Sequence, residues 1–295
     1  VAMTPSARVV GTLTLIGENP LETERLWRKM YRGTMYFGRT SVTISAMAAV
    51  DIALWDLKGK LLQQPVYNLL GGPQKDRIFC YATGNDVDWY QELGFKAFKL
   101  ACPYGPADGL EGLDKNEAFV AQARETIGDA CELMLDCWMA FDVEYTVRLA
   151  EVLRPYRLKW MEECLLSEDY DAHLALRQRL PWQTLSTGEH WYTHVPFQWA
   201  VRHHAVDILQ PDIFYFGGMI RSMKVARMAE ALGKTCVPHI SGSGLGYLYM
   251  MHFVSALPNA GPYHEFKGFN RDIPVEAVGS SLTSQRGRVK VPTGP

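Results

Sequence analysis

The chain has 295 residues, 47% of them hydrophobic, and its 30 basic and 32 acidic side chains leave a formal net charge of −2. This balance gives no reason to expect nucleic acid or an anionic membrane as a partner, and the chain is long enough to bury a large core. It contains neither an 18-residue apolar run nor a charged leader followed by apolar residues, so we expect a cytoplasmic protein that does not span a membrane.

The six cysteines show no CxxC motif and no zinc-type spacing. In a chain of this length such scattered cysteines are typical of free thiols in a reducing compartment, not of a disulfide framework. They are Cys80, Cys102, Cys131, Cys137, Cys164 and Cys236.

The N-terminal part is predicted to be helical. Segments 21–32 and 44–63 carry apolar residues at helical spacing, and Gly-Gly-Pro at 71–73 is a strong stop signal. We therefore place a domain boundary near residue 75. No strand pairs are evident in residues 1–75, so its helices need a neighbour to cover their apolar faces.

Beyond this boundary, short apolar runs that end in a polar residue alternate with amphipathic stretches. Eight strands joined by helices imply an all-parallel sheet, and eight units within residues 76–267 match a (β/α)₈ TIM barrel. An open doubly wound sheet is the alternative, but the segment after the first strand, ATGND, is not a GxGxxG phosphate turn. Residues 268–295 are interpreted as a C-terminal return that packs on the N-terminal piece. The predicted strands are 78–82, 95–100, 131–136, 158–163, 183–189, 206–212, 235–239 and 262–266, and the predicted helices include 115–126, 142–153, 168–179 and 220–232.

Charged side chains close six of the predicted strands, 23 to 27 residues apart, which is about one βα unit each time. In a barrel, residues at that period converge on one mouth, where barrel enzymes keep their chemistry. We therefore expect a polar site built from Asp136, Glu162, Glu189, Asp212, His239 and Glu265.

Asp136, Glu162 and Glu189 close three successive strands, so their carboxylates can point at one spot. Clustered carboxylates repel one another unless a cation lies between them. Oxygen ligands without thiolate or imidazole favour Mg²⁺ or Mn²⁺ over zinc. A surface acidic cluster balanced by nearby basic residues is the alternative.

Asp212 and His239 close adjacent strands. An aspartate that holds one imidazole nitrogen fixes the tautomer and raises the basicity of the other, which makes this pair a candidate general base. Lys99 closes the second strand and can present its ammonium group at the same mouth. His190 is interpreted as a proton donor or an outer-shell group, and Glu163 is expected to face away, because side chains alternate along a strand.

These residues lie in segments that resemble the enolase superfamily, in its mandelate racemase subgroup and closest to the acid-sugar dehydratases that act on L-rhamnonate. The resemblance covers about residues 22–267. It is carried by ERLWRKMYRGTMYFGR, AVDIALWDLKGKLL, PVYNLLGG, LMLDCWM, LKWMEECL, STGEHW, ILQPDIFYFGG and VPHISGS.

The resemblance implies Mg²⁺ on Asp136, Glu162 and Glu189, and it assigns Glu265 to stabilising the enolate. Lys99 matches the first lysine of the subgroup's KxK pair, whereas the second position is Ala101, which disfavours a two-base racemase.

The implied reaction is Mg²⁺-dependent dehydration of a sugar acid, such as L-rhamnonate, to a 2-keto-3-deoxy acid through α-proton abstraction. A cycloisomerase, an epimerase or racemase, and a barrel that only binds a sugar acid are the alternatives. A homo-oligomer is expected.

Family members carry an N-terminal α+β capping domain. Only its helical part is visible in residues 1–75, so we expect the cap to extend beyond this sequence.

Overall fold

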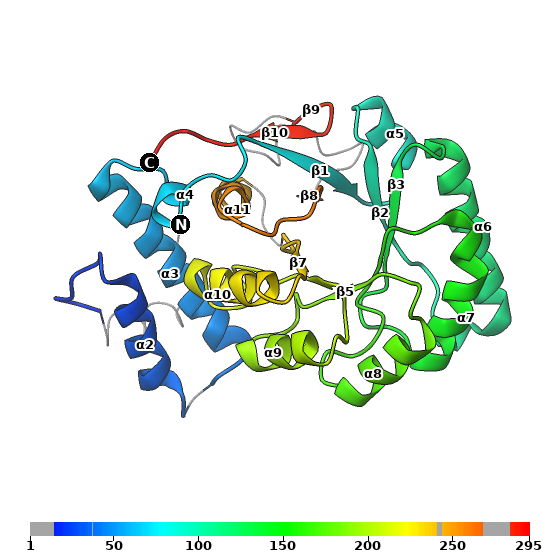
Figure 1. Cartoon of the computed structure of the whole chain (residues 1–295), viewed down its shortest axis with the longest axis horizontal. Coiled ribbons are helices and arrows are strands. Elements are labelled where there is room, and N and C mark those ends of the chain that lie inside the picture. Colours follow the sequence, from blue (N-terminus) through cyan, green and yellow to red (C-terminus); the bar gives the residue numbers. More distant parts are fainter. Residues whose placement is uncertain (1–14, 37, 241–243, 268–283) are drawn as a thin grey trace.

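The computed structural model describes residues 15–36, 38–240, 244–267 and 284–295. A curled sheet with helices around it forms the larger part of the molecule, and helices α2 (Thr23–Thr34) and α3 (Ser41–Leu62) lie at one side of it (Figure 1). No helix within the described ranges has both the length and the apolar character needed to cross a lipid bilayer.

The sheet contains eight parallel strands in the order β8-β1-β2-β3-β4-β5-β6-β7. Its two ends approach through a bridge between Cys236 of β7 and Ala260, just before β8. The predicted TIM-barrel class is therefore confirmed, although several strands are shorter than expected. The strands are β1 (Arg77–Thr83), β2 (Ala97–Ala101), β3 (Glu132–Asp136), β4 (Met161–Glu162), β5 (Leu185–Thr187), β6 (Ile208–Leu209), β7 (Thr235–Cys236) and β8 (His264–Phe266).

Helices connect the strands and cover the outside of the sheet (Figure 1). Helices α5, α9 and α11 are not among the ranges that the sequence analysis located. Helix α11 is apolar on most sides and packs in the interior, so it lacks the polar face that reveals a surface helix. The remaining helices are α4 (Val66–Leu69), α5 (Val87–Glu92), α6 (Gly109–Ile127), α7 (Val143–Leu153), α8 (Tyr170–Arg179), α9 (His194–Arg202), α10 (Met219–Glu230) and α11 (Leu245–Ser255), with 3₁₀ turns η1 (Pro106–Asp108) and η2 (Arg154–Tyr156).

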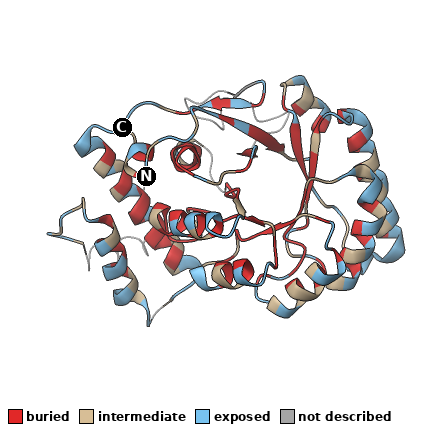
Figure 2. Cartoon of the chain, in the orientation of Figure 1, coloured by how far each residue is buried: buried red, intermediate tan, exposed pale blue. Residues whose placement is uncertain are grey.

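Burial follows this layering (Figure 2). The strands and the inward faces of the helices are buried, whereas the outward faces of α6, α7 and α8 are largely exposed. All six cysteines are free thiols, as predicted, and five of them are buried. The interior also holds fully buried charged side chains, which is unusual unless they are paired. They are Asp51, Lys99, Glu162, Asp212 and Glu265.

The C-terminal segment contributes a hairpin of β9 (Ser284–Gln285) and β10 (Arg288–Lys290), which the sequence did not predict. Strand β10 pairs antiparallel with the beginning of β1, where Lys290 lies opposite Arg77. Pro295 approaches within 3.9 Å of the position that a side chain on Gly59 of α3 would occupy. Residues 268–283 of the predicted return lie outside the described residues.

A buried carboxylate joins α3 to the barrel. Asp51 is fully buried, and its Oδ2 accepts a hydrogen bond of 2.8 Å from the amide of Met219, the first residue of α10. It therefore caps a helix of the barrel from the opposite domain. Gly218 precedes that helix at φ 99°, and a Cβ there would lie 2.1 Å from Asp51 Oδ2, so this contact requires glycine.

Burial raises the pKa of Asp51 from its ordinary 3.8 to about 7, although the amides of Met219 and Ile220 oppose that change. An acid with a higher pKa in the folded state binds more protons there, so its contribution to the free energy of unfolding decreases as pH rises. This decrease occurs between about pH 4 and 7, and the free energy of unfolding falls by at most roughly 1.4 kcal/mol per pH unit.

We predict that Asp51→Asn removes this component of the pH dependence, because an amide keeps the acceptor oxygen and does not ionise. Urea unfolding of both proteins at intervals between pH 4.5 and 7.5 measures it. Asp171→Asn, at an exposed position in the first turn of α8, is the control. Parallel pH profiles for Asp51→Asn and the wild type would contradict the prediction.

Candidate active site

The ends of neighbouring strands bring acidic side chains together at the mouth of the barrel. The register places Ala101 of β2 opposite Asp136 of β3, and Asp136 opposite Glu162 of β4. Because parallel strands end at the same edge of a sheet, both carboxylates lie at the carboxyl-terminal mouth.

Lys99 binds these carboxylates together. Its Nζ lies 3.4 Å from Asp136 Oδ2 and 3.2 Å from Glu265 Oε1, and it also pairs with Glu162 Oε1. Burial alone would lower the pKa of Lys99, but Glu162 and Glu265 raise it well above its ordinary value. Lys99 is thus a buried ammonium group surrounded by acids.

Glu162 is disfavoured as a charged group despite this partner. Burial raises its pKa, and Lys99 opposes that shift without cancelling it. Its second oxygen, Oε2, accepts hydrogen bonds of 2.9 Å from Trp160 Nε1 and 2.8 Å from Gln210 Nε2. These contacts, from the residue before β4 and the residue after β6, hold the carboxylate in place inside the barrel.

Asp212 and His239 form a hydrogen-bonded pair beside this cluster. His239 Nδ1 lies 2.7 Å from Asp212 Oδ2, and both residues are buried. Burial lowers the pKa of His239, but Glu265, Glu189 and Asp212 raise it to a net value above the ordinary one. With Nδ1 bound to the carboxylate, Nε2 is the atom that can take up a proton.

Glu265 is the acid of β8. It accepts hydrogen bonds of 2.7 Å from Thr83 Oγ1 and 3.0 Å from the amide of Ile240. Burial alone would raise its pKa, but Lys99 and Lys267 hold that pKa below its ordinary value. Glu265 is therefore an anion that is fixed by both β1 and the segment after β7.

Glu163 does not face away from the site, and this prediction was wrong. Strand β4 ends at Glu162, and Glu163 has a left-handed backbone at φ 45°, so the alternation of side chains along a strand does not extend to it. Its Oε2 lies 2.7 Å from His190 Nδ1, and Glu163 is the main cause of the raised pKa of His190.

Left-handed backbone also occurs at Trp138 and Met139, one residue beyond Asp136, with φ of 45° and 61°. Such conformations are costly for residues with side chains and concentrate at functional sites. Here the turn directs the amide of Trp138 to Asp136 Oδ1 at 3.1 Å, which orients that carboxylate.

Glu189 lies between the two histidines. Its Oε1 is 3.3 Å from His239 Nε2 and 3.8 Å from His190 Nδ1. Burial raises its pKa to about 9, because Glu163 and Glu162 reinforce that effect while His239 and Lys99 oppose it only in part. Glu189 thus lies among buried acids whose charge His239 and Lys99 balance only in part.

The structure divides the predicted site into two neighbouring groups. Asp136, Glu162 and Glu265 surround Lys99, whereas Glu189 lies with His239 and His190. Among the described residues, the one set of three side chains whose ligand atoms lie within 4.8 Å of one another is Glu163, Glu189 and His190. The expected trio of metal ligands is not in such close contact in the described residues.

Lys267 is a charged member of the site that the sequence reading missed. It follows β8 directly, and its Nζ contacts His239 Nε2. A signal was available, because Lys267 is a basic residue directly after the predicted strand 262–266 that carries Glu265.

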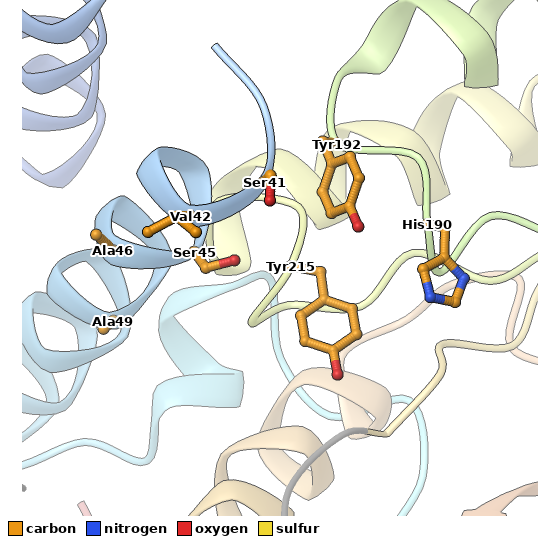
Figure 3. A pocket seen from close by; sticks show the side chains of 8 residues that line it. All are labelled: Ser41, Val42, Ser45, Ala46, Ala49, His190, Tyr192 and Tyr215. Carbon is orange, nitrogen blue, oxygen red and sulfur yellow. The ribbon is translucent and has the colours of Figure 1, made fainter. Parts of the chain in front are cut away.

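A cavity of about 430 Å³ opens beside this site, between the barrel and the start of α3 (Figure 3). His190, Tyr192 and Tyr215 line it from the barrel, and Ser41 and Ser45 face them from α3. Its volume is in the range of small-molecule pockets. Hydroxyl and imidazole groups on one side and small residues on the other suit a polar ligand.

A curated protein of known activity is similar to this chain. The chain is 42% identical to the L-rhamnonate dehydratase of Saccharopolyspora erythraea over 251 residues, which are 85% of this chain and 63% of that protein. The chain thus spans less than two thirds of the length of this curated relative.

Two solved structures are also similar. A rhamnonate dehydratase from Gibberella zeae in complex with Mg is 34% identical, with a TM-score of 0.85 over 94% of this chain and 69% of that one. The 3,6-anhydro-D-galactonate cycloisomerase of Zobellia galactanivorans is 30% identical, with a TM-score of 0.89 over 99% of this chain and 83% of that one.

Two family models cover most of the sequence. Residues 7–71 match the N-terminal domain of mandelate racemase and muconate lactonizing enzyme. Residues 85–295 match the enolase C-terminal domain-like family, and they include all eight residues that the sequence assigned to the site. The chain therefore belongs to the mandelate racemase and muconate lactonizing enzyme family, with an enolase C-terminal domain-like barrel.

Proposed function

We propose that this protein dehydrates a sugar acid of the L-rhamnonate class to a 2-keto-3-deoxy acid with the help of Mg²⁺. The observation that carries the proposal is the Asp212–His239 pair, whose Nε2 faces the buried acids at the barrel mouth. A base held in this way suits the removal of a weakly acidic proton. The similarity to rhamnonate dehydratases supports the choice of substrate class.

The carboxylates of Asp136, Glu162 and Glu189 would hold the metal. Their oxygen donors suit Mg²⁺, and the raised pKa of Glu189, about 9, reflects its burial among acids that His239 and Lys99 balance only in part. When bound, Mg²⁺ supplies positive charge next to the substrate carboxylate, which makes the α proton easier to remove.

His239 is proposed as the base. Asp212 holds Nδ1, so Nε2 presents its lone pair to the substrate and accepts the α proton. Lys99 Nζ and Glu265 Oε1 lie 3.2 Å apart in the buried part of the site. There they position the carboxylate cluster and help to stabilise the charge that develops on the substrate.

His190 is proposed to bind the hydroxyl groups of the sugar chain. Glu163 orients it through a bond of 2.7 Å, and it lines the cavity together with Tyr192 and Tyr215. The cavity extends from the mouth toward Ser41, which gives room for the carbons beyond the reacting centre (Figure 3).

We also propose that the enzyme is cytoplasmic, which the six free thiols support. A homo-oligomer stays a prediction from the sequence.

The first test is a panel of sugar acids, including L-rhamnonate, incubated with Mg²⁺ in D₂O. We expect one member of the panel to yield a 2-keto-3-deoxy acid, detected by ¹H NMR and by a colour assay for keto acids. Exchange of the α proton without loss of water would instead indicate an epimerase or racemase, and an isomeric product would indicate a cycloisomerase. Ligand binding with neither exchange nor product would indicate a barrel that only binds.

A second test removes the base. His239→Asn should abolish dehydration and α-proton exchange together, because Asn cannot take up the proton, while Mg²⁺ still binds. His204→Asn is the matched control, since His204 is exposed and its left-handed backbone tolerates asparagine. Turnover retained in His239→Asn would refute the assignment.

A third test concerns the metal ligands. Glu189→Gln should weaken Mg²⁺ binding by more than the roughly 10- to 100-fold that loss of an outer-shell partner costs, because it removes an anionic ligand. Isothermal titration with Mg²⁺ alone measures this independently of activity, with the exposed Glu168→Gln as control. In parallel, EDTA should abolish turnover of the wild type and Mg²⁺ should restore it. Unchanged Mg²⁺ affinity in Glu189→Gln would exclude Glu189 as a ligand.

A further inference from the structure

A second cavity lies away from the candidate active site, where α2 meets α9 and α10 (Figure 1). Its volume is about 440 Å³, which is in the range of small-molecule pockets. It shares no lining residue with the cavity beside the barrel mouth. The two cavities are therefore separate places for a ligand.

Arg221 of α10 brings a buried charge to this second cavity. The residue is only 8% exposed, and its guanidinium carbon lies 4.5 Å from the ring centre of Trp27 and 4.7 Å from that of Phe216. These rings hold the guanidinium group in place through cation–π contacts. Within the described ranges no carboxylate pairs with Arg221, which is unusual for a buried charge.

The hydrogen bonds of Arg221 are also incomplete. Its Nη2 lies 3.3 Å from His194 Nδ1, whereas Nη1 is buried and has no hydrogen-bond partner among the described residues. Burial lowers the pKa of Arg221 to about 10, so the group still carries its charge at neutral pH. An incompletely paired buried charge is costly, and an anion next to it would offset that cost.

The surroundings of Arg221 add further positive charge and a further donor. Burial lowers the pKa of His194, and Arg221 and Lys224 lower it further, so the ring is neutral at pH 7. Because Nδ1 accepts from Arg221, the ring proton lies on Nε2, which can donate. Arg28 and Lys224 also line the cavity, and both pair with Glu24, the one acid among its lining residues. Three basic side chains against one carboxylate leave an excess of positive charge.

Apolar side chains form another part of the wall. Trp27 and Tyr31 stack with their ring centres 5.2 Å apart, and Val225 and Met228 line the cavity from α10. A hydrogen bond of 2.7 Å from Trp27 Nε1 to the carbonyl oxygen of Gly217 fixes the indole ring. Guanidinium groups recognise carboxylates and phosphates through their forked N–H donors. The combination suits a ligand that carries one anionic group on an apolar body.

We propose that this cavity binds a small organic anion, a carboxylate or phosphate group on an aromatic or other apolar body, with Arg221 as its anchor. A ligand there contacts α2 as well as α9 and α10, so it strengthens the attachment of the N-terminal helices to the barrel. The proposal is independent of the proposed dehydration.

Titration calorimetry with phenylacetate and with phenyl phosphate tests the proposal. EDTA is present throughout, so that no metal draws the anions to the acids at the barrel mouth. We expect at least one of the two compounds to bind with a Kd of about 1 mM or lower, and the tighter one identifies the anionic group. The uncharged counterparts, phenylacetamide and phenol, should bind at least about tenfold more weakly, because they lack the charge that Arg221 recognises.

Two variants locate the binding. Arg221→Met keeps an unbranched side chain without the charge and should weaken binding by roughly 10- to 100-fold, the usual effect of losing a charge-assisted hydrogen bond. Met228→Trp keeps Arg221 but fills the cavity from a partly buried position, and it should weaken binding as strongly. Arg202→Met, at the exposed end of α9, is the matched control and should bind as the wild type does.

A Kd above about 1 mM for both anions would overturn the inference, as would equal binding of the uncharged compounds. Unchanged affinity in Arg221→Met or in Met228→Trp would place the anion elsewhere and would also refute it. Circular dichroism checks that each variant is folded, and if Arg221→Met is not, Met228→Trp decides.

Discussion

The burial of several carboxylates around a single lysine is the constraint on which the site depends. Glu162 and Glu265 are fully buried, and Lys99 reaches both of them as well as Asp136. Unpaired buried charges are costly, so the interior can hold these acids only in an arrangement that keeps cations beside them. The strands that carry them are thereby held in one register at the mouth. Around Glu189, by contrast, His239 and Lys99 balance the charge of the neighbouring acids only in part.

Two further features adapt a common barrel to this chemistry. The first is the left-handed backbone at Trp138 and Glu163, which turns a backbone amide toward Asp136 and a carboxylate toward His190. The second is the junction between α3 and α10, where Asp51 caps a barrel helix. Because α3 also lines the cavity through Ser41 and Ser45, this junction fixes the wall against which a ligand would bind. Helix α3 thus both attaches the N-terminal helices to the barrel and forms part of the cavity wall.

The two lysines of the site have different surroundings. Lys99 is fully enclosed by acids, which hold its proton, so it acts as a fixed charge. Lys267 is only partly buried, and its Nζ contacts Nε2 of His239.

The sequence by itself determined the fold class and the strand-end residues, because the βα period places the last residue of every strand at one mouth. Asp136, Glu162, Asp212 and Glu265 could be located in this way without coordinates. Only the tertiary structure decided which of these side chains touch, because contacts between strands depend on backbone angles and packing that the spacing of the βα units does not specify. Glu163 joined the site because its backbone is left-handed, and Lys267 because the ring of His239 lies within its reach. The alternation of side chains does not extend beyond the end of a strand, and Glu163 and Lys267 both lie directly beyond such an end.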